Sequence, residues 1–442
     1  MERTYDFIAV GVGPFNLGLA CLTAPIETLD GVFLDKSEQF NWHPGMLLQD
    51  TTLQIPFMAD LVTLADPTSP FSFLNYLKAQ GRIYSFYIRE NFLVLRNEYN
   101  HYCRWVIEQL PNIHFNTSVK KIEFEEDTGI YHVHCLCTKT DQAKTYRAKR
   151  LVLGTGTVPY VPACCVDIMD KAIHSASYLF EKEALQSKRS ITILGSGQSA
   201  AEVYYDLLQD IDRYDYELSW ITRSPRFFPL EYSKLTLEMT SPGYIDYFYS
   251  LPQQEKDHLL SQQKHLYKGI NNDLVAAIYD LLYTKSLSSD IKVHLFTNSE
   301  LQQATFNGPG NGFDLLFHQK EQNRSYRRAT EALVLATGYT YQLPGFVQGI
   351  SSRIKWDEKG RFDVNRNYSI DHKGCEIFVQ NAELHTHGFT APDLGMGCYR
   401  NAYIIKEMTG ENHYPVEQKI TFQQFGIAGD EHVHKVTPEL AV

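Results

Sequence analysis

Two glycine-rich turns carry the residues of this chain that are best suited to chemistry. They run from Gly11 to Asn16 (GVGPFN) and from Gly195 to Ala200 (GSGQSA). In turns of this type the first glycine permits a tight bend, the second lets the backbone approach a pyrophosphate, and the following helix offers its N-terminal N–H groups to the phosphates. The first turn has Asn16 where a third small residue is usual, whereas the second keeps Ala200. The spacing predicts two dinucleotide sites.

The residues that follow each turn distinguish the two nucleotides. Asp35 ends the strand after the first turn, where a ribose hydroxyl needs an acceptor. The corresponding strand after the second turn ends at Arg223 without an acid, and an arginine there fits a 2′-phosphate. We therefore expect FAD on the first turn and NADPH, in preference to NADH, on the second. The competing interpretations are a structural turn and a surface arginine. Two such sites on one chain usually transfer hydride from a nicotinamide to a flavin.

Two strand–helix–strand units position these turns. Apolar, β-branched runs precede the turns at 5–10 and 190–194, and further runs follow at 32–34 and 218–222. The sequence predicts an α/β fold with two Rossmann-like dinucleotide-binding domains and a small helical substrate domain. The expected boundaries are 1–170, completed by 336–425, for the FAD-binding domain; 185–230, completed by 290–335, for the NADPH-binding domain; 231–289 for the helical substrate-binding domain; and 426–442 for a solvated tail.

Composition narrows the class of partners. The chain has 442 residues, a formal net charge of −11 and 43% apolar residues, and such an acidic protein lacks the basic surface that binds nucleic acid or anionic membranes. No signal-like N-terminus and no run of about twenty apolar residues is present, which predicts a cytoplasmic protein without a membrane span. The eight cysteines lack C-x-x-C spacing. We therefore expect no metal, and O2 rather than a disulfide as the electron acceptor.

Several further segments, collinear along most of the chain, resemble the N-hydroxylating flavin monooxygenases. This family hydroxylates lysine, ornithine and diamines for hydroxamate siderophores. WHPGM at 42–46 and DPTSP at 66–70 are the narrowest of the shared motifs, while ATGY at 336–339 is broader. The other matched segments are 11–17, 54–61, 73–77, 153–156, 195–200 and 381–400.

The resemblance implies a cycle in which NADPH reduces FAD, O2 adds at flavin C4a, and a neutral substrate amine takes the distal oxygen. By motif position it assigns Gln54, as the catalytic residue, to the C4a neighbourhood, and Trp42, His43 and Met46 to the rest of the isoalloxazine. Each of these residues could instead be a packing residue. The full set of expected cofactor contacts is Gly11, Gly13, Pro14, Phe15, Asn16, Asp35, Trp42, His43, Met46, Gly195, Gly197, Gln198, Ser199, Arg223, Thr337, Gly338, Tyr339 and Leu394.

One departure from the family pattern bears on the substrate. The lysine and ornithine hydroxylases carry, at the position of Ala59, a lysine that binds the carboxylate of the amino acid. A methyl group cannot pair a buried carboxylate, and an unpaired buried charge costs several kcal/mol. The simplest interpretation is a diamine, with Glu383 or Asp393 binding its second ammonium. In the alternative, Lys268 or Arg82 takes over carboxylate binding and the substrate is still lysine.

The resemblance therefore favours the diamine branch of the family, with putrescine slightly preferred to cadaverine, and implies a homotetramer. L-lysine N6-hydroxylation or L-ornithine N5-hydroxylation remains the alternative within the family. Outside it, an NADPH-dependent flavin reductase or oxidase would show only uncoupled peroxide release. A non-enzymatic flavoprotein would show no amine-dependent NADPH consumption.

Overall fold

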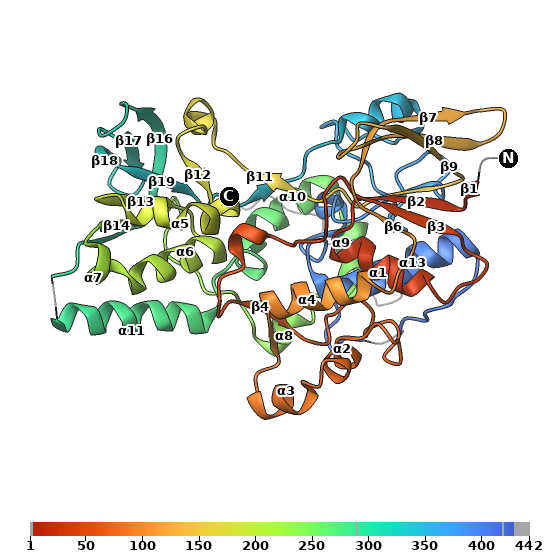
Figure 1. The fold of residues 1–442 in the computed structure, drawn as a ribbon, viewed down its shortest axis with the longest axis horizontal. Coiled ribbons are helices and arrows are strands. Elements are labelled where there is room, and N and C mark those ends of the chain that lie inside the picture. Colours follow the sequence, from red (N-terminus) through yellow and green to blue (C-terminus); the bar gives the residue numbers. More distant parts are fainter. Residues whose placement is uncertain (1–2, 289, 418–419, 428–442) are drawn as a thin grey trace, which may run out of the picture.

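The computed structural model describes residues 3–288, 290–417 and 420–427. Two lobes lie side by side, one containing β2 and β3 and the other β13 and β14 (Figure 1). Each lobe is built on a five-stranded sheet. The two Rossmann-like units predicted from the sequence therefore form the two halves of the molecule.

The first sheet has the order β21-β10-β2-β3-β6 and all of its strands are parallel. Its central strands are fully buried apolar runs, as expected for a parallel sheet covered on both faces. Alternate side chains pack against helices on one face and against an antiparallel meander on the other. The strands are β2 (Phe7–Val10), β3 (Gly31–Leu34), β6 (Ile113–His114), β10 (Leu151–Leu153) and β21 (Ile377–Val379). The helices are α1 (Pro14–Thr23), α4 (Arg96–Ile107) and α13 (Gly397–Thr409).

The second sheet repeats this plan in the order β12-β19-β13-β14-β15, again parallel. Its strands are β12 (Ile173–His174), β13 (Ser190–Leu194), β14 (Glu217–Ile221), β15 (Val293–Phe296) and β19 (Ala332–Leu335). One face packs on α5 (Tyr178–Gln186), α6 (Gln198–Gln209) and α11 (Asn272–Ser288), with the short helix α7 (Ile211–Tyr214) after α6. The other face packs on a second meander of β16 (Ser299–Phe306), β17 (Phe313–Gln319) and β18 (Arg324–Thr330).

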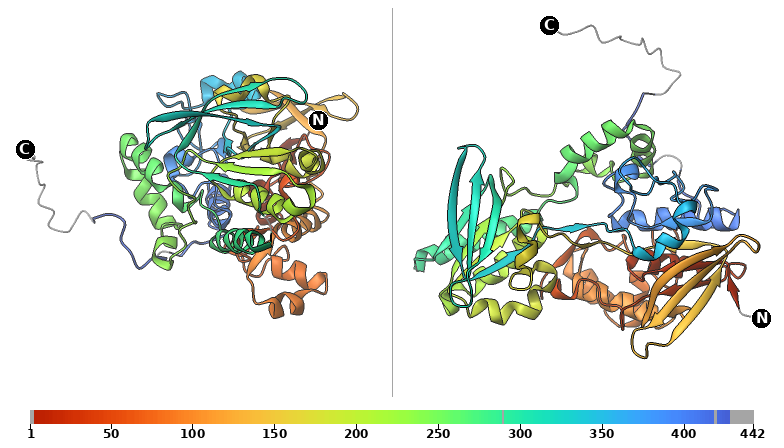
Figure 2. Two further views of the ribbon diagram at one scale, coloured as in Figure 1. Left: turned by 90° about the vertical axis from the view of Figure 1, so that its left-hand side faces the viewer. Right: turned by 90° about the horizontal axis from the view of Figure 1, so that it is seen from above.

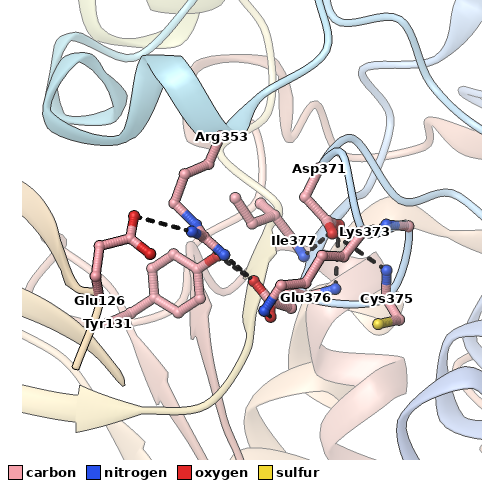
Figure 3. A network of polar contacts seen from close by, with 9 residues as sticks. Glu126, Tyr131, Arg353, Asp371, Lys373, Cys375, Glu376 and Ile377 are labelled. Atoms are coloured by element: carbon pink, nitrogen blue, oxygen red, sulfur yellow. Dashed lines mark hydrogen bonds and ion pairs between the residues drawn. The ribbon is translucent and has the colours of Figure 1, made fainter. Parts of the chain in front are cut away.

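The meander of the first lobe consists of β7 (Thr117–Glu125), β8 (Ile130–Cys137) and β9 (Ala143–Ala148), with β1 (Thr4–Tyr5) alongside β9. A polar network fastens it to the sheet (Figure 3). Arg353 Nε donates to Tyr131 Oη at 3.1 Å, and Arg353 Nη2 donates to Glu376 at 2.5 Å. Beside them, Asp371 accepts four backbone N–H bonds from residues 374–377 just before β21. The meander is thus held to the segment that leads into β21, the edge strand of the sheet.

The helical segment is smaller than predicted. The helices α9 (Pro242–Ser250) and α10 (Gln253–Gln262) pack with α12 (Leu384–His387) of the first lobe, and Phe389 joins their apolar cluster, while the short helix α8 (Lys234–Leu237) precedes them. Figure 2 shows α9 and α10 above the C-terminal part of that lobe. In contrast, α11 buries Ile278 against the second sheet. Its inclusion in a 231–289 substrate domain was therefore wrong, because its apolar face completes the core of the NADPH-binding lobe.

Other features connect the lobes or extend from them. An antiparallel ribbon of β11 (Val158–Pro159) and β20 (Tyr339–Thr340) crosses between the lobes. A second ribbon pairs β4 (Thr52–Pro56) with β5 (Leu93–Leu95), and α2 (Phe73–Ala79) and α3 (Ile83–Arg89) lie between them in sequence.

The remaining features are the C-terminal residues and the cysteines. Phe425, the last residue of the 336–425 segment, packs in the α9 cluster, and most of the expected tail at 426–442 lies outside the described residues. All eight cysteines are free. Among the described residues, no helix is long and apolar enough to cross a membrane.

Candidate functional site

The first glycine turn has the geometry of a phosphate site. Gly11 has φ +90°, and a Cβ there would lie 2.3 Å from the carbonyl oxygen of Gly154. A Cβ at Gly13 would meet no atom within 4 Å, so the turn has open space where a pyrophosphate would lie. The helix α1 begins at Pro14, and no side chain caps its first N–H groups. These features fit FAD, whose phosphates would accept hydrogen bonds from these groups.

Asn16 stands where a small residue is usual because its side chain makes hydrogen bonds in the core. Its side-chain Nδ2 donates to the carbonyl oxygen of Gly11 at 2.7 Å, and its Oδ1 accepts from Gln380 at 2.9 Å. Gln380 also donates to Asn401 on α13, whose Nδ2 donates to the carbonyl oxygen of Phe15. The turn is therefore held from behind by α13. Asn16 and Phe15 shape the site from this side.

Asp35 lies at the end of β3, as predicted. Its Oδ2 accepts from the N–H of Val12 in the turn at 2.7 Å, and its Oδ1 accepts from Ser37 N–H at 2.7 Å. An ionised carboxylate has about four acceptor positions, so a ribose hydroxyl can still bind. The carboxylate is thereby fixed beside the turn.

The second turn repeats the geometry of the first. A Cβ at Gly195 would lie 2.2 Å from the carbonyl oxygen of Ala336, the residue after β19. The helix α6 begins at Gln198 without a side-chain cap on its N-terminus, and Ser199 follows in the first turn. The backbone oxygen of Lys268 approaches Gly197, at 3.4 Å from a Cβ placed there. This turn fits the pyrophosphate of NADPH.

A cationic group lies near the second turn. Arg223 follows β14, and its side chain is 68% exposed with Glu300 at 3.8 Å. Burial lowers the pKa of Lys268, and the charges of Lys264 and Arg223 lower it further. Three positive charges are thus close enough to affect one another, which suits a 2′-phosphate. Lys268, considered above as a cation for a substrate carboxylate, lies at the nucleotide turn instead.

The segment WHPGM lies at the boundary between the lobes. Trp42 packs on the first core, with its ring 5.4 Å from that of Tyr99. His43 has φ +51°, and its ring lies 5.4 Å from that of Tyr339; burial and the charge of Arg96 lower the pKa of His43 to about 4. Met46, however, is 2% exposed within the core of the second lobe. The motif thus inserts this side chain into the neighbouring domain, and the assignment of Met46 to the flavin surroundings stays a prediction.

Gln54 also reaches across the boundary. Its Nε2 donates to Gln198 Oε1 at 3.3 Å and to the carbonyl oxygen of Gly269 at 3.3 Å. Gln54 is therefore placed between the flavin lobe and the second turn, and a direct catalytic role stays a prediction.

Thr337, Gly338 and Tyr339 form the return crossing between the lobes. Thr337 Oγ1 donates to the carbonyl oxygen of Tyr160 at 2.5 Å, and the carbonyl oxygen of Gly338 accepts from Tyr160 N–H at 2.9 Å. The ring of Tyr339 lies 5.4 Å from both His43 and His174. These contacts fix the crossing segment that joins the two lobes.

The segments that carry Ala59, Asp393 and Leu394, three of the residues expected at the site, meet at Gly395. A Cβ at Gly395 would lie 3.6 Å from the Ala59 Cβ and 3.0 Å from Asp393 Oδ1. Asp393 caps the short helix η6 (Leu394–Met396) by accepting from Gly395 N–H at 2.7 Å. Burial raises the pKa of Asp393, although the bonds from Gly395 and Met396 and the charge of Arg400 oppose this. A methyl group and a carboxylate therefore stand together without a lysine.

Glu383 has a different role from the one expected. It is 0% exposed, and its Oε1 lies 2.9 Å from Nη2 of the equally buried Arg400. A carboxylate already paired in the core is not available to a substrate ammonium. The structure thus argues against Glu383, and Asp393 is the better candidate. Arg82, the other cation considered, pairs with Glu98 at 2.9 Å.

A family model described as L-lysine 6-monooxygenase/L-ornithine 5-monooxygenase matches residues 3–341. The chain belongs to this family. A putrescine N-hydroxylase from Shewanella oneidensis is 52% identical over 96% of this chain and 85% of the relative. A second putrescine N-hydroxylase, from Acinetobacter baumannii, is 46% identical over 98% of this chain and 96% of the relative.

A solved structure resembles the fold of this family member over almost its whole length. It is the FAD-bound cadaverine monooxygenase of the desferrioxamine pathway from Erwinia amylovora. The TM-score is 0.95 at 57% identity, with 97% of this chain and 100% of that chain covered. The two-lobed arrangement described above is thus shared with a flavin enzyme of the same family.

Sequence reasoning missed the side chains that support the site. Asp60 accepts from the N–H groups of Val62, Thr63 and Phe73 and so fixes the loop that carries Ala59. Arg96 and Glu202 form a bond between the lobes. The Asp60 contacts had a local signal in the D-x-x-T pattern of the loop, whereas the Arg96 contact joins residues 106 positions apart. In the part of the chain that is described, no group of three or more His, Cys, Asp or Glu is placed to hold a metal ion.

Proposed function

We propose that this family member uses FAD, NADPH and O2 to N-hydroxylate a primary aliphatic diamine in hydroxamate siderophore biosynthesis. The balanced reaction consumes the amine, O2, NADPH and a proton, and yields the hydroxylamine, water and NADP+. FAD supplies the chemistry that activates O2 when it is bound. The protein supplies binding, orientation and exclusion of water.

The proximity of Ala59 and Asp393, which both lie next to Gly395, supports the substrate class. A diamine replaces the head of an amino acid with a second ammonium, which needs an anion and not a cation. The carboxylate of Asp393 lies beside the methyl group of Ala59, separated by Gly395. Neither Lys268 nor Arg82 takes the place of a lysine at 59, because one lies at the second turn and the other pairs with Glu98. The geometry therefore favours a diamine over lysine or ornithine.

The residues divide the work as follows. The N-termini of α1 and α6 hold the two pyrophosphates, Asp35 binds a ribose hydroxyl, and Arg223 binds the 2′-phosphate. Asp393 fixes the distal ammonium of the diamine. A primary amine with a pKa of about 10.4 must lose a proton to react, which costs about 4 kcal/mol at pH 7.5. Desolvation of the amine between the lobes lowers that cost.

The chain length of the diamine is the finest part of the proposal. We favour putrescine, as the Shewanella and Acinetobacter relatives are named for it. Cadaverine is the second candidate, because the solved relative at 57% identity is a cadaverine monooxygenase. One methylene in an apolar site is worth only about 1–3 kcal/mol. Both diamines should therefore be substrates, with different kcat/KM.

The test of the function is a substrate panel. The purified holoenzyme is given NADPH and O2 with putrescine, cadaverine, diaminopropane, lysine or ornithine, and hydroxylamine and peroxide are measured against NADPH oxidised. We expect hydroxylamine with putrescine and cadaverine. Peroxide as the sole product with every amine would identify a flavin oxidase instead. NADPH consumption that no amine increases would exclude an amine hydroxylase.

We also propose a cytoplasmic homotetramer. Two exposed apolar surfaces support self-association: Tyr84, Tyr87 and Ile88 on α3, at 71–78% exposure, and Tyr279, Tyr283 and Leu287 on α11, at 62–71%. Isolated apolar residues are normal on a surface, but groups of this kind mark interaction sites. Light scattering of the holoenzyme tests this proposal, and a monomer at micromolar concentration would contradict it.

A further inference from the structure

Two side chains of the flavin lobe leave neighbouring points of one ribbon and reach the same helix of the other lobe. Gln54 lies within β4. Arg96 is the first residue of α4, directly after β5, and its N–H bonds to the carbonyl oxygen of Thr51 at 2.9 Å. Because β4 and β5 are paired, the two side chains are held at a fixed separation. In Figure 1, β4 lies where the two lobes meet.

Their partners are one turn apart on α6. Gln198 accepts from Gln54 at 3.3 Å, and Glu202 accepts two bonds from Arg96, at 2.8 Å and 2.7 Å. Residues four apart lie on the same face of a helix. Gln198 Nε2 also donates to Glu202 Oε1 at 2.8 Å, which joins the two contacts. The β4–β5 ribbon is thus bonded to α6, the helix whose N-terminus follows the second glycine turn.

A third segment joins this contact. The N–H of Asn271 donates to Gln198 Oε1 at 2.7 Å, and the carbonyl oxygen of Gly269 accepts from Gln54. This segment leads from the helical insertion into α11. Gln198 is therefore the point at which the flavin lobe, the second turn and the insertion are connected.

The ion pair between Arg96 and Glu202 is buried. Glu202 is 3% exposed, and the Arg96 side chain is 15% exposed. Burying two charges costs as much free energy as their attraction returns, so such a pair is poor evidence for stability. A two-bond arginine–carboxylate contact does fix distance and orientation. Domains joined by thin crossings move relative to each other unless a contact prevents it.

From these observations we infer that Arg96 and Glu202 are a positioning pair that sets the separation between the nicotinamide site and the flavin site. The pair acts through α6, whose N-terminal turn receives the pyrophosphate of NADPH, and it touches no reacting atom. This inference rests on the proposed cofactors. It assigns hydride transfer, rather than oxygen transfer, as the step that depends on the pair.

The test replaces both residues so that no unpaired charge remains. Arg96→Met with Glu202→Leu keeps the volume and the fold while it removes the fixed geometry. The matched control is Arg353→Met with Glu376→Leu, a pair within the flavin lobe whose side chains are both 15% exposed. FAD content and urea unfolding establish that each variant is folded.

Three measurements on the holoenzyme test the inference. With Arg96→Met/Glu202→Leu, anaerobic reduction of FAD at saturating NADPH should be at least 30-fold slower, while reduction by dithionite is unchanged and the Kd of NADP+ changes less than 3-fold. Small-angle X-ray scattering should show a larger radius of gyration, which is a readout independent of activity. The control pair should change none of these quantities.

The contrary results are distinct. A reduction rate within 2-fold of the wild type and unchanged scattering would overturn the positioning role, and an equal loss in the control pair would do the same. Reduction is measured without any amine. Failure of diamine turnover would therefore overturn the proposed function and leave this test intact.

Discussion

The Ala59 methyl group and the Asp393 carboxylate flank Gly395, since a Cβ built there would lie 3.6 Å from the Ala59 Cβ and 3.0 Å from Asp393 Oδ1. The two segments meet from distant parts of the chain, one after β4 and the other before α13. A long cation at position 59 would enter the space next to that carboxylate. Under the proposed function, the charge at this point is expected to separate diamines from amino acids.

Ala59→Lys should lower kcat/KM for putrescine at least 100-fold, because a second ammonium near the substrate ammonium costs about 4 kcal/mol at 4 Å and an effective dielectric constant of 20. The same variant should gain measurable turnover of lysine or ornithine. Steady-state hydroxylamine formation checks both effects. Ala59→Met separates bulk from charge, and an equal loss in that variant would show that only size matters.

Asp393→Asn should raise KM for diamines at least 10-fold and leave FAD content unchanged. Asparagine caps a helix as well as aspartate does, so the bond to Gly395 N–H is kept and only the charge is lost. Burial raises the pKa of Asp393, so the wild-type KM should increase as the pH falls, beginning above the ordinary pKa of an aspartate. A variant whose KM has the same acid limb as the wild type would exclude Asp393.

Arg223→Gln should weaken NADPH binding 10- to 100-fold and leave NADH almost unaffected. A charge-assisted hydrogen bond to phosphate contributes about 1.5–3 kcal/mol, and NADH has no 2′-phosphate. Flavin reduction rates at varied NADPH and NADH give both constants. Equal weakening of the two coenzymes would place Arg223 away from the 2′-phosphate.

Arg353→Ala should destabilise the protein by about 1.5–3 kcal/mol, since it removes the arginine bond to the partly buried Glu376 and leaves that carboxylate with Lys373 and Tyr131 alone. The pKa of Glu376 lies below its usual value: burial opposes this, but bonds from Lys373, Arg353 and Tyr131 outweigh it. A carboxyl group whose pKa is lowered by folding stabilises the fold at pH values above its ordinary pKa. This stabilisation is lost as the pH falls through the lowered pKa of the folded state. The variant should therefore show a weaker acid dependence in urea unfolding, with unchanged turnover per bound FAD. A wild-type unfolding midpoint would contradict the network of Figure 3.

Local sequence patterns were enough to predict the two sheets, both glycine turns and the places of Asp35 and Arg223 after their strands, while the binding roles of these two residues stay predictions. Each of these depends on residues within one strand–helix–strand unit, where periodicity and turn chemistry are decisive. The burial of Met46, the ion pair of Glu383 and the packing of α11 could not be predicted, for the opposite reason. The partners of these groups lie in the other lobe, on α13 or on the second sheet, and no local pattern records such contacts.

The support of the first turn shows the same limit. Asn16 departs from the glycine pattern because Gln380, 364 positions later, fills its hydrogen-bonding capacity. In the sequence, Asn16 makes the first glycine motif a poorer match to the usual pattern. In the structure it joins α1 to α13.

A single competition experiment distinguishes a diamine hydroxylase from an amino acid hydroxylase. Equal concentrations of putrescine, cadaverine, lysine and ornithine are mixed with the holoenzyme, NADPH and O2, and the N-hydroxylated products are quantified by mass spectrometry at low conversion. The product ratios equal the ratios of kcat/KM. We predict that the two diamines account for more than 99% of the product. Hydroxylysine or hydroxyornithine in amounts equal to or above the diamine products would contradict the account.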